Sequence, residues 1–375
     1  MRVKKHGNSY GKIVYLITFA SVQSKEKRDM SDTVQAEKEF SIEMIPEPEK
    51  IEEIIYSLMV NPNLSVINYF NDFSEKSISP ESIGDSDTDE TGLFDLDNNG
   101  NAMAMSTHAF HHHLESDPQK ATEILISRAT RKMLCFGAKP TAVSALLYHI
   151  NVADPNGGLI ASGAKKGLEN AAQKFNLQIS DRKIRFDNFS EHGIVPPTII
   201  VSMMAQVANK KNLTTHTFKK KGNHIFLIGK TRDDINSSEY LEFFHGISDS
   251  PLPAFDIKEE IEIQKVLKKL NEEKLIESAS PVGKGGLFFT LLRAAIPNNL
   301  GFDITTDAET RLDAFLFGES MGRVIVGVNP GLEEEFVDAM SETNIPFFTL
   351  GHVTKGEIRV DDESFGFIDK MTVGV

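Results

Sequence analysis

The sequence contains a single cysteine, fewer basic than acidic residues, and no apolar segment long enough to cross a membrane. Cys135 cannot form an internal disulfide, which fits a protein of the reducing cytoplasm. Its apolar neighbours in KMLCFGAKP favour a small buried side chain over a reactive thiol. We therefore expect a cytoplasmic protein with no membrane partner.

The charge balance excludes a second class of partner. The chain has 40 Lys and Arg residues against 54 Asp and Glu, which gives a formal net charge of −14. Nucleic acids attract basic surfaces, so we expect no nucleic-acid partner. A chain of 375 residues with 40% hydrophobic residues can bury the cores of two domains. No short-period repeat is present, which excludes a solenoid.

The first 44 residues differ from the rest of the chain. They have a basic opening and a short apolar segment, IVYLITFA, which lacks the length to span a bilayer and is not followed by a clean cleavage site. We expect residues 1–44 to be a disordered or variable leader. A start at Met30 and a weak signal peptide are the alternatives.

Apolar residues recur at helical or strand spacing along the rest of the chain. Helices are predicted at about 51–59, 117–136, 158–175, 258–273 and 331–342, and after a Gly-rich turn within 281–295. Strands are predicted on both sides of the NNG turn at 98–100, after Gly137, in PPTIIVSMMAQVAN, and at 224–230 and 323–328. The elements alternate in two blocks that meet near residues 215–222, which predicts two α/β or α+β layers.

The hairpin contains a partial calcium-binding pattern. Asp95, Asp97, Asn99 and Gly100 match the start of an EF-hand loop, D-x-[DN]-x-[DN]-G. Ser106 occupies the twelfth position, where the motif needs a bidentate Glu, and strands rather than helices are predicted on both sides. We therefore expect no calcium site.

Four histidines lie close together in STHAFHHHLESDP, at positions 108, 111, 112 and 113. On a strand, His111 and His113 would face the same side, whereas on a helix His108 would share a face with His111 or His112. Zinc would need a tetrahedral set, and no fourth donor is identifiable. We favour an exposed or interface loop and predict no metal. A metal site and a phosphate contact are the alternatives.

Several segments in a fixed order resemble a known family. They are AMAMSTH, DPQKATEILISRATRKMLCFGAKPTAV, SSEYLEFFHG, SPVGKGGLFFTLLRAA, LFGESMGRVIVGV and IPFFTLGHV. Together they resemble the second half of phosphoribosylformylglycinamidine (FGAM) synthase, an enzyme family of purine biosynthesis. The resemblance extends from about Ile45 to Val360.

The resemblance implies a two-domain PurM-like fold of α/β and α+β type, shared with the aminoimidazole ribotide (AIR) synthase-related superfamily. Residues 45–215 would form an AIR synthase-related N-terminal-like domain, whose sheet pairs with an equivalent sheet into a barrel. Residues 216–375 would form the C-terminal-like α+β domain. The implied partner is a second copy of the chain or a homologous half, and a glutaminase subunit would supply ammonia.

The resemblance also implies an ATP-dependent C–N ligase chemistry. In the family, ATP lies where the two domains meet, is held by metal ions on acidic side chains, and activates an amide oxygen for attack by ammonia. The implied cofactor is therefore ATP or ADP with Mg²⁺. No glutaminase is evident in this chain, because Cys135 lacks the setting of a nucleophile.

The sequence departs from the family at the metal-binding positions. His108 stands where the family has Asp after Ser-Thr, and Arg131-Lys132 stands for Arg-Asn. DRKIRFDN, at 181–188, replaces a Gly-Asn-Val-Ser segment. The signature Ser-Ala-His-Asp-Val-Ser-Asp-Gly-Gly becomes SASPVGKGG at 278–286, which loses the histidine and both acids. Imidazole is a poor substitute for a carboxylate on Mg²⁺, so we expect the isolated chain to be inactive.

A smaller set of residues keeps a possible role in binding phosphate. Glycines let a backbone approach a phosphate closely, a helix N-terminus favours an anion, and a lysine adds a point charge. On that basis the candidate nucleotide- or phosphate-binding residues are Thr107, His108, Gly283, Lys284, Gly285 and Gly286. The alternative is a tight turn with a solvated lysine.

Three other residues of the matching segments are predicted to be structural. We expect Glu239 and Glu319 to cap a turn or to pair with Arg323, and we expect His245 to be a structural histidine.

Three functions follow from these observations. The first is an FGAM synthase-like nucleotide-binding half or subunit that needs a partner. The second is a non-catalytic structural or regulatory homodimer, and the third is a small-metabolite kinase of the same superfamily. The catalytic residues cannot be named from the sequence.

Overall fold

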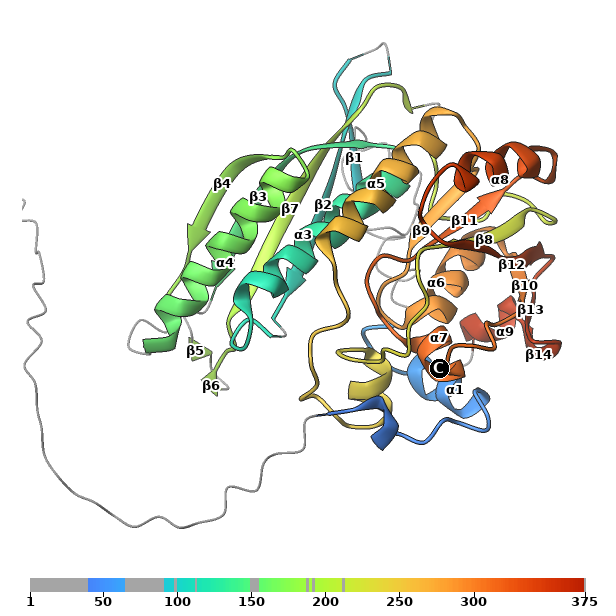
Figure 1. Cartoon of the computed structure of the whole chain (residues 1–375), viewed down its shortest axis with the longest axis horizontal. Helices are drawn as coiled ribbons and strands as arrows, with labels where there is room; N and C mark the ends of the chain where they lie inside the picture. The colour runs from blue at the N-terminus through green and yellow to red at the C-terminus, as the bar shows by residue number, and fades with distance from the viewer. Residues whose placement is uncertain are drawn as a thin grey trace, which may run out of the picture. The chain divides into compact units, whose positions relative to one another are not determined.

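The computed structural model describes residues 40–64, 91–97, 100–111, 113–148, 155–186, 189–190, 193–210 and 213–373. Residues 1–39 of the expected leader, and the Asn-Asn pair of the predicted turn, lie outside this part of the chain. Residues 40–375 form one unit, which contains a five-stranded and a seven-stranded sheet (Figure 1). The predicted domain boundaries at 44/45 and 215/216 stay a prediction.

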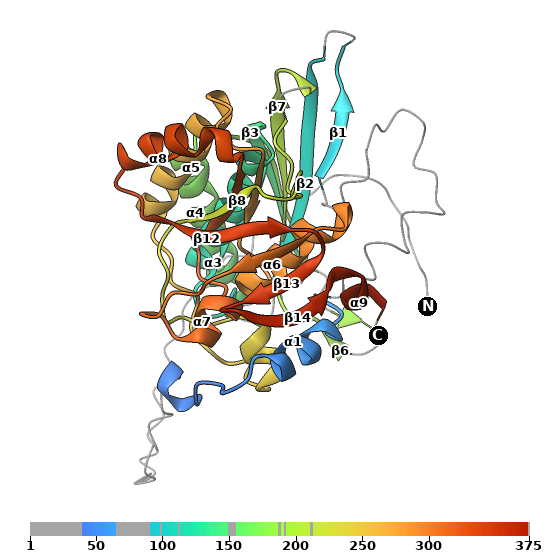
Figure 2. The same cartoon turned by 90° about the vertical axis from the view of Figure 1, so that its right-hand side faces the viewer.

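The first sheet has the strand order β1-β2-β7-β3-β4. Only β3 and β4 run parallel, and the other neighbours are antiparallel. The strand β1 lies at one edge of the sheet (Figure 2). The strands are β1 (Thr91–Asp95), β2 (Ala102–Phe110), β3 (Lys139–Tyr148), β4 (Gln178–Ile184) and β7 (Thr198–Val207), and a short separate hairpin is formed by β5 (Phe189–Ser190) and β6 (Gly193–Ile194).

Alternation along β2 sets the two faces of this sheet. Ala102 and Ala104 are buried beneath the helices, whereas Met103 and Met105 lie half-buried on the other face. Side chains of a strand alternate between faces, so the predicted hairpin places small residues where helices pack closely. The helices α3 (Pro118–Cys135) and α4 (Pro155–Lys174) cover that inner face (Figure 1).

The helix α3 begins at an Asp cap and packs tightly on α4. The side chain of Asp117 accepts a hydrogen bond from the backbone N–H of Lys120 at 2.9 Å, and a proline follows in the first turn. A Cβ atom on Gly163 of α4 would lie 2.5 Å from the Cγ atom of Pro118, and one on Gly167 would overlap the backbone oxygen of Gln119. The two helices can approach this closely only because α4 has glycine at both positions.

The seven-stranded sheet has the order β14-β13-β10-β12-β8-β11-β9, with only β10 and β13 parallel (Figure 1). Its strands are β8 (His224–Ile228), β9 (Ser278–Pro281), β10 (Gly301–Ile304), β11 (Val324–Val328), β12 (Phe347–Thr354), β13 (Glu357–Val360) and β14 (Glu363–Phe367). The remaining helices are α1 (Glu52–Met59), α5 (Ile257–Glu272), α6 (Gly286–Ala295), α7 (Leu312–Phe317), α8 (Glu333–Ser341) and α9 (Ile368–Val373).

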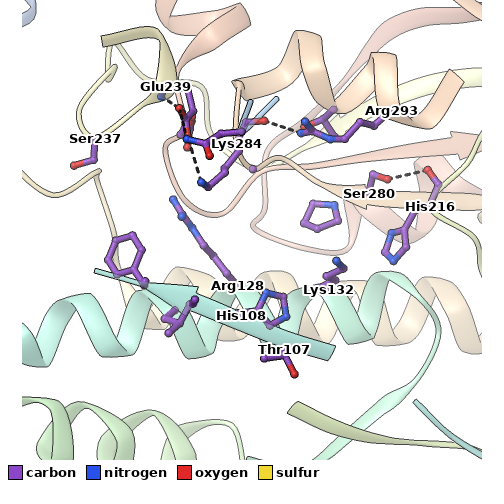
Figure 3. A pocket seen from close by; sticks show the side chains of 18 of the residues that line it. Thr107, His108, Arg128, Lys132, His216, Ser237, Glu239, Ser280, Lys284 and Arg293 are labelled. Carbon is purple, nitrogen blue, oxygen red and sulfur yellow. Dashed lines mark hydrogen bonds and ion pairs between the residues drawn. The ribbon is translucent and has the colours of Figure 1, made fainter. Parts of the chain in front are cut away.

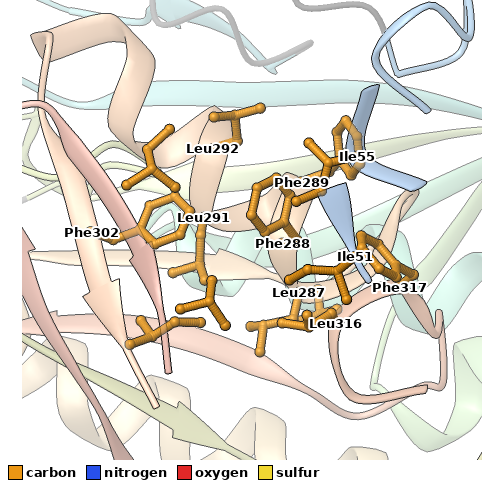
Figure 4. Packing of buried hydrophobic residues seen from close by; sticks show 14 of the residues in the cluster. Ile51, Ile55, Leu287, Phe288, Phe289, Leu291, Leu292, Phe302, Leu316 and Phe317 are labelled. Carbon is orange, nitrogen blue, oxygen red and sulfur yellow. The ribbon is translucent and has the colours of Figure 1, made fainter. Parts of the chain in front are cut away.

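Both faces of this sheet are covered, which explains the continuous apolar run in β8. Ile225 and Leu227 face a core with α6, α7 and α1, whereas Phe226 and Ile228 face a second core with α5 and α8. The first core is rich in phenylalanine, including Phe288, which lies edge-on to Phe302 (Figure 4). The helix α1 thus packs with the seven-stranded sheet.

A buried ion pair links a helix of the five-stranded sheet to a helix of the seven-stranded sheet. Arg131 of α3 forms an ion pair with Glu260 of α5, and both side chains are buried. Gln264 donates a hydrogen bond to the same carboxylate at 3.1 Å. Arg131, which the resemblance aligns with the conserved Arg-Asn pair, therefore has a structural contact.

Most elements predicted from the sequence are confirmed, including the mixed α/β fold class and every predicted helix. Cys135 is buried as expected, and burial raises the pKa of its thiol. Strand β4 was not predicted: it is a charged edge strand whose pairing with β3 decides its conformation. In the described ranges, no helix has both the length and the apolar character to span a membrane.

Candidate functional site

A cavity of about 610 Å³ lies between the two sheets (Figure 3). One wall comes from β2 and α3, and the opposite wall comes from residues 237–242 and the Gly-rich turn before α6. Of the predicted site residues, Thr107, His108, Gly283 and Lys284 line the cavity, whereas Gly285 and Gly286 lie buried behind it. The fold therefore brings together two segments that are about 175 residues apart in the sequence.

Arg128 and Lys132 extend from α3 into the cavity (Figure 3). Residues four apart lie on the same helix face, so the two cations are neighbours. The Nε atom of Arg128 donates to the sulfur of Met321 at 3.2 Å, and its guanidinium lies 5.9 Å from the ring centre of Phe110. Burial lowers the pKa of Arg128, and the nearby charge of Glu319 opposes that change. We call Arg128, Lys132 and His108 the α3 wall.

His108 and Thr107 lie on opposite faces of β2. The Nε2 atom of His108 is 2.8 Å from the hydroxyl of Ser106, on the face that turns to the cavity. Thr107 points away (Figure 3), and its hydroxyl lies 3.1 Å from that of Ser202 on β7. Although Thr107 borders the cavity, its side chain lies on the other face of the sheet. His108 remains a candidate contact for a ligand.

The two histidines after β2 that the structure describes, His111 and His113, have different surroundings. His111 is exposed at the cavity, His112 lies outside the described residues, and the Nε2 atom of His113 is 2.6 Å from the hydroxyl of Ser237. Burial lowers the pKa of His113, against the charge of Asp249. His113 therefore links the segment after β2 to the opposite wall. The described residues contain no group of three or more His, Cys, Asp or Glu that could hold a metal ion.

Two backbone donors of the Gly-rich turn have partners within the chain. The N–H of Gly285 donates to Oε1 of Glu319 at 2.9 Å, and the N–H of Gly286 donates to the carbonyl of Gly283 at 2.9 Å. Gly286 has φ of 70°, and a Cβ atom there would lie 2.6 Å from the carbonyl oxygen of Leu316. These glycines fit the turn against α7, and their predicted role in binding phosphate stays a prediction.

Lys284 pairs with a buried carboxylate across the turn. Its Nζ atom lies 3.1 Å from Oε1 of Glu239, and the other oxygen of Glu239 accepts from Asn61 at 2.8 Å and Asn63 at 3.2 Å. Burial raises the pKa of Glu239, but these hydrogen bonds and the charge of Lys284 outweigh it, so the pKa lies below its ordinary value. Glu239 is therefore a charged anchor for Lys284. We call this region, with Glu319, the turn wall.

Glu319 joins the turn to residue 239. Its Oε1 atom accepts from the backbone N–H groups of both Gly285 and Glu239, each at 2.9 Å. Burial raises the pKa of Glu319, although Arg128 and the two donors act in the opposite direction. The expected capping role of Glu319 agrees with these contacts. The expected pairing with Arg323 is wrong, because Arg323 donates to the carbonyls of Phe315 and Gly318.

Sequence reasoning missed several cavity residues. Arg293 of α6 lines the cavity and donates to the carbonyl of Lys284 at 2.7 Å. His216 also lines it, and its Nδ1 atom lies 2.7 Å from the carbonyl of Ala279. Burial lowers the pKa of His216 to about 4. The spacing of Arg128 and Lys132 was the one available signal for the α3 wall. His245, predicted to be structural, packs edge-on to Tyr240.

Part of the chain matches a known protein family, and most of it is similar in sequence to known proteins. Residues 220–363 match the C-terminal domain of AIR synthase related proteins. The chain is 26% identical over 340 residues to phosphoribosylformylglycinamidine synthase subunit PurL of Alkaliphilus metalliredigens, which covers 89% of this chain and 46% of that protein. The chain thus spans about half the length of the curated relatives it matches.

Solved structures show the same fold. Thermotoga maritima PurL complexed with FGAR has a TM-score of 0.68 at 15% identity, covering 87% of this chain and 54% of that one. The same protein complexed with ATP has a TM-score of 0.67 at 15% identity, covering 87% and 52%. These findings confirm the PurM-like fold, and they agree with the resemblance inferred from the sequence: the chain is similar to PurL, and its residues 220–363 match the AIR synthase related C-terminal domain.

Proposed function

We propose that this chain is a nucleotide-binding half of the FGAM synthase type that works in purine biosynthesis together with a partner subunit. The observation that carries the proposal is the cavity of about 610 Å³ with basic side chains on both walls. Sites for small molecules and cofactors commonly measure about 300–1,000 Å³. Thermotoga maritima PurL, which has the same fold, has been solved in complex with ATP.

The residues of the cavity do not fit a magnesium site. Mg²⁺ needs hard oxygen donors in octahedral geometry. The buried carboxylates Glu239 and Glu319 are already engaged by donors from Asn61, Lys284 and the backbone. We therefore propose that amidine formation takes place in a partner, and that the chain alone does not hydrolyse ATP.

Calorimetry of the full chain with ADP and with ATP tests the proposal. We expect saturable binding of one nucleotide per chain, in buffer with Mg²⁺ or in buffer with EDTA. Lys183→Ala, which removes an exposed lysine on the edge strand β4, is a matched control that should bind as the wild type does. Absence of heat at millimolar nucleotide in both buffers would contradict the proposal.

One observation favours a second candidate, a homodimer or a pairing with a homologous half. The face of the first sheet opposite α3 and α4 presents half-exposed apolar side chains, among them Met105 on β2, Leu146 on β3 and Met204 on β7. The antiparallel register places Met105 beside Met204. Apolar faces of this kind mark protein interfaces.

Sedimentation velocity tests this pairing. We expect the wild type to be a dimer, and Met204→Lys to shift it towards the monomer because a charge would be buried in the interface. Gln173→Lys adds the same charge on α4, at an exposed position on the other side of the sheet, and should leave the dimer intact. A monomeric wild type at micromolar concentration would exclude a homodimer.

A further inference from the structure

We infer that this cavity binds the phosphates of its nucleotide through protein cations in place of Mg²⁺, so that metal-free ADP or ATP is the preferred ligand. The inference rests on the proposed nucleotide-binding function. It differs from that function because it specifies the ionic form of the ligand and the groups that neutralise it.

Basic residues stand at three positions where the resemblance implies acidic or amide side chains. By that resemblance, His108 stands for Asp after Ser106-Thr107, Lys132 stands for Asn, and Lys284 stands for the second Asp of the glycine-rich signature. With His108 neutral, these changes make the site more positive by four charges; the charge of Lys284 is offset by its ion pair with Glu239, so the α3 wall carries the cations that face the ligand. All three residues line the same cavity.

The α3 wall presents two neighbouring cations to the cavity. Arg128 and Lys132 lie one helical turn apart and both point into the cavity (Figure 3). Like charges at this spacing repel each other, and an anion between them relieves that repulsion. Arg128 is half-buried, and the sulfur of Met321 to which it donates is a weak acceptor. A phosphate would give the guanidinium a strong, charge-assisted pair of hydrogen bonds.

The buried carboxylates of the cavity already accept hydrogen bonds from other groups of the chain. A metal ion at this cavity would have to displace Lys284 and the two asparagine donors from Glu239, and two backbone donors from Glu319. Glu242, the remaining carboxylate of the lining, is exposed. Mg²⁺ on the ligand would also reduce the negative charge that Arg128 and Lys132 attract. Magnesium should therefore weaken binding.

Calorimetric titration of the full chain with ADP, and separately with inorganic pyrophosphate, tests the inference. We expect ADP to bind at least about tenfold more tightly in EDTA than in excess Mg²⁺, and we expect affinity to fall steeply with salt. Pyrophosphate should show the same preference, because the recognition is of phosphate. Binding that requires Mg²⁺ overturns the inference and leaves the nucleotide-binding function standing. Absence of binding in both buffers overturns the function itself.

A variant that restores the family residues provides an independent test. His108→Asp combined with Lys132→Asn should lose at least about tenfold in affinity for metal-free ADP and should bind ADP more tightly when Mg²⁺ is added. Lys183→Asn is the matched control, since it removes a lysine far from the cavity. Thermal unfolding of both proteins verifies that they fold. A folded double variant that binds metal-free ADP as the wild type does would falsify the inference.

Discussion

The two walls of the cavity differ in how their polar groups are satisfied. On the turn wall, Glu239 and Glu319 bind side-chain and backbone donors of the chain itself. On the α3 wall, Arg128 donates to a sulfur and lies near an aromatic ring. A wall whose carboxylates are held by several donors of the chain fixes a shape, whereas a guanidinium that donates to a sulfur is suited to an anionic ligand. The turn wall, which contains the glycine-rich motif of the sequence, thus has the more structural role of the two walls.

Glu319→Ala should break this difference most severely. It leaves the buried N–H groups of Gly285 and Glu239 without their acceptor, and each such loss costs about 2 kcal/mol, so we expect about 4 kcal/mol of lost stability. Urea unfolding measures it. Glu115→Ala, which removes an exposed carboxylate, should change the free energy of unfolding by less than about 0.5 kcal/mol. A stability of Glu319→Ala equal to that of the control would show that the turn wall does not depend on this carboxylate.

Acid should destabilise the folded protein through His216, a buried cavity residue outside both named walls. Its pKa is lowered from 6.5 to about 4, so the native state keeps it neutral while the unfolded chain takes up a proton below pH 6.5. This contribution is fully present above pH 6.5 and declines as the pH falls to about 4, by up to about 3 kcal/mol.

Unfolding free energies of the wild type and His216→Gln at pH 7 and pH 4.5 test this expectation. The wild type should lose more stability than the variant over this interval, because only the wild type has the buried imidazole. Equal losses in the two proteins would mean that another group is responsible.

Arg128→Gln sharpens the comparison from the side of the ligand. Hydrogen bonds to a charged group contribute about 1.5–3 kcal/mol, so we expect ADP to bind at least about tenfold more weakly. Calorimetry in EDTA measures the change, and urea unfolding should show only a small loss of stability. Unchanged affinity would remove Arg128 from the ligand contacts.

Lys284→Ala should have the smallest effect. The Lys284 side chain is 55% exposed and its ammonium already pairs with Glu239, so we expect an affinity change of about twofold or less. The same titration, run beside Arg128→Gln, compares the loss of ADP affinity caused by a change on each wall. A larger loss for Lys284→Ala than for Arg128→Gln would reverse the assignment of the walls.

Much of the fold could be predicted because its elements have clear periods. The helices α3 and α5 and the alternating strand β2 follow from the spacing of their apolar residues. The strand β4 has charged residues at Asp181, Arg182 and Lys183 and no such period. It is extended because it pairs with β3, which is a tertiary cause that a local pattern does not contain.

The site could be predicted only in part. His108 and Lys284 were found because they interrupt a resemblance, and both line the cavity. The spacing of Arg128 and Lys132 shows that they share a helix face, but no local pattern tells which distant segment that face meets. The partner of Glu319 was missed for the same reason, since the acceptor and the Gly285 donor are 34 residues apart.

Gly163 and Gly167 affect the proposed binding site without lining it, because they allow the close contact between α3 and α4. At Gly163 and Gly167 the neighbouring atoms belong to a proline ring, to main chain and to the Cβ atom of Thr122, none of which can move aside as the end of a long side chain can. A methyl group there would have to move α3 itself, together with Arg128 and Lys132. The packing of α3 on α4, outside the cavity, therefore sets the distance between the two cations and the opposite wall. Substitutions on α4, remote from any phosphate, should appear in a mutational survey as binding defects.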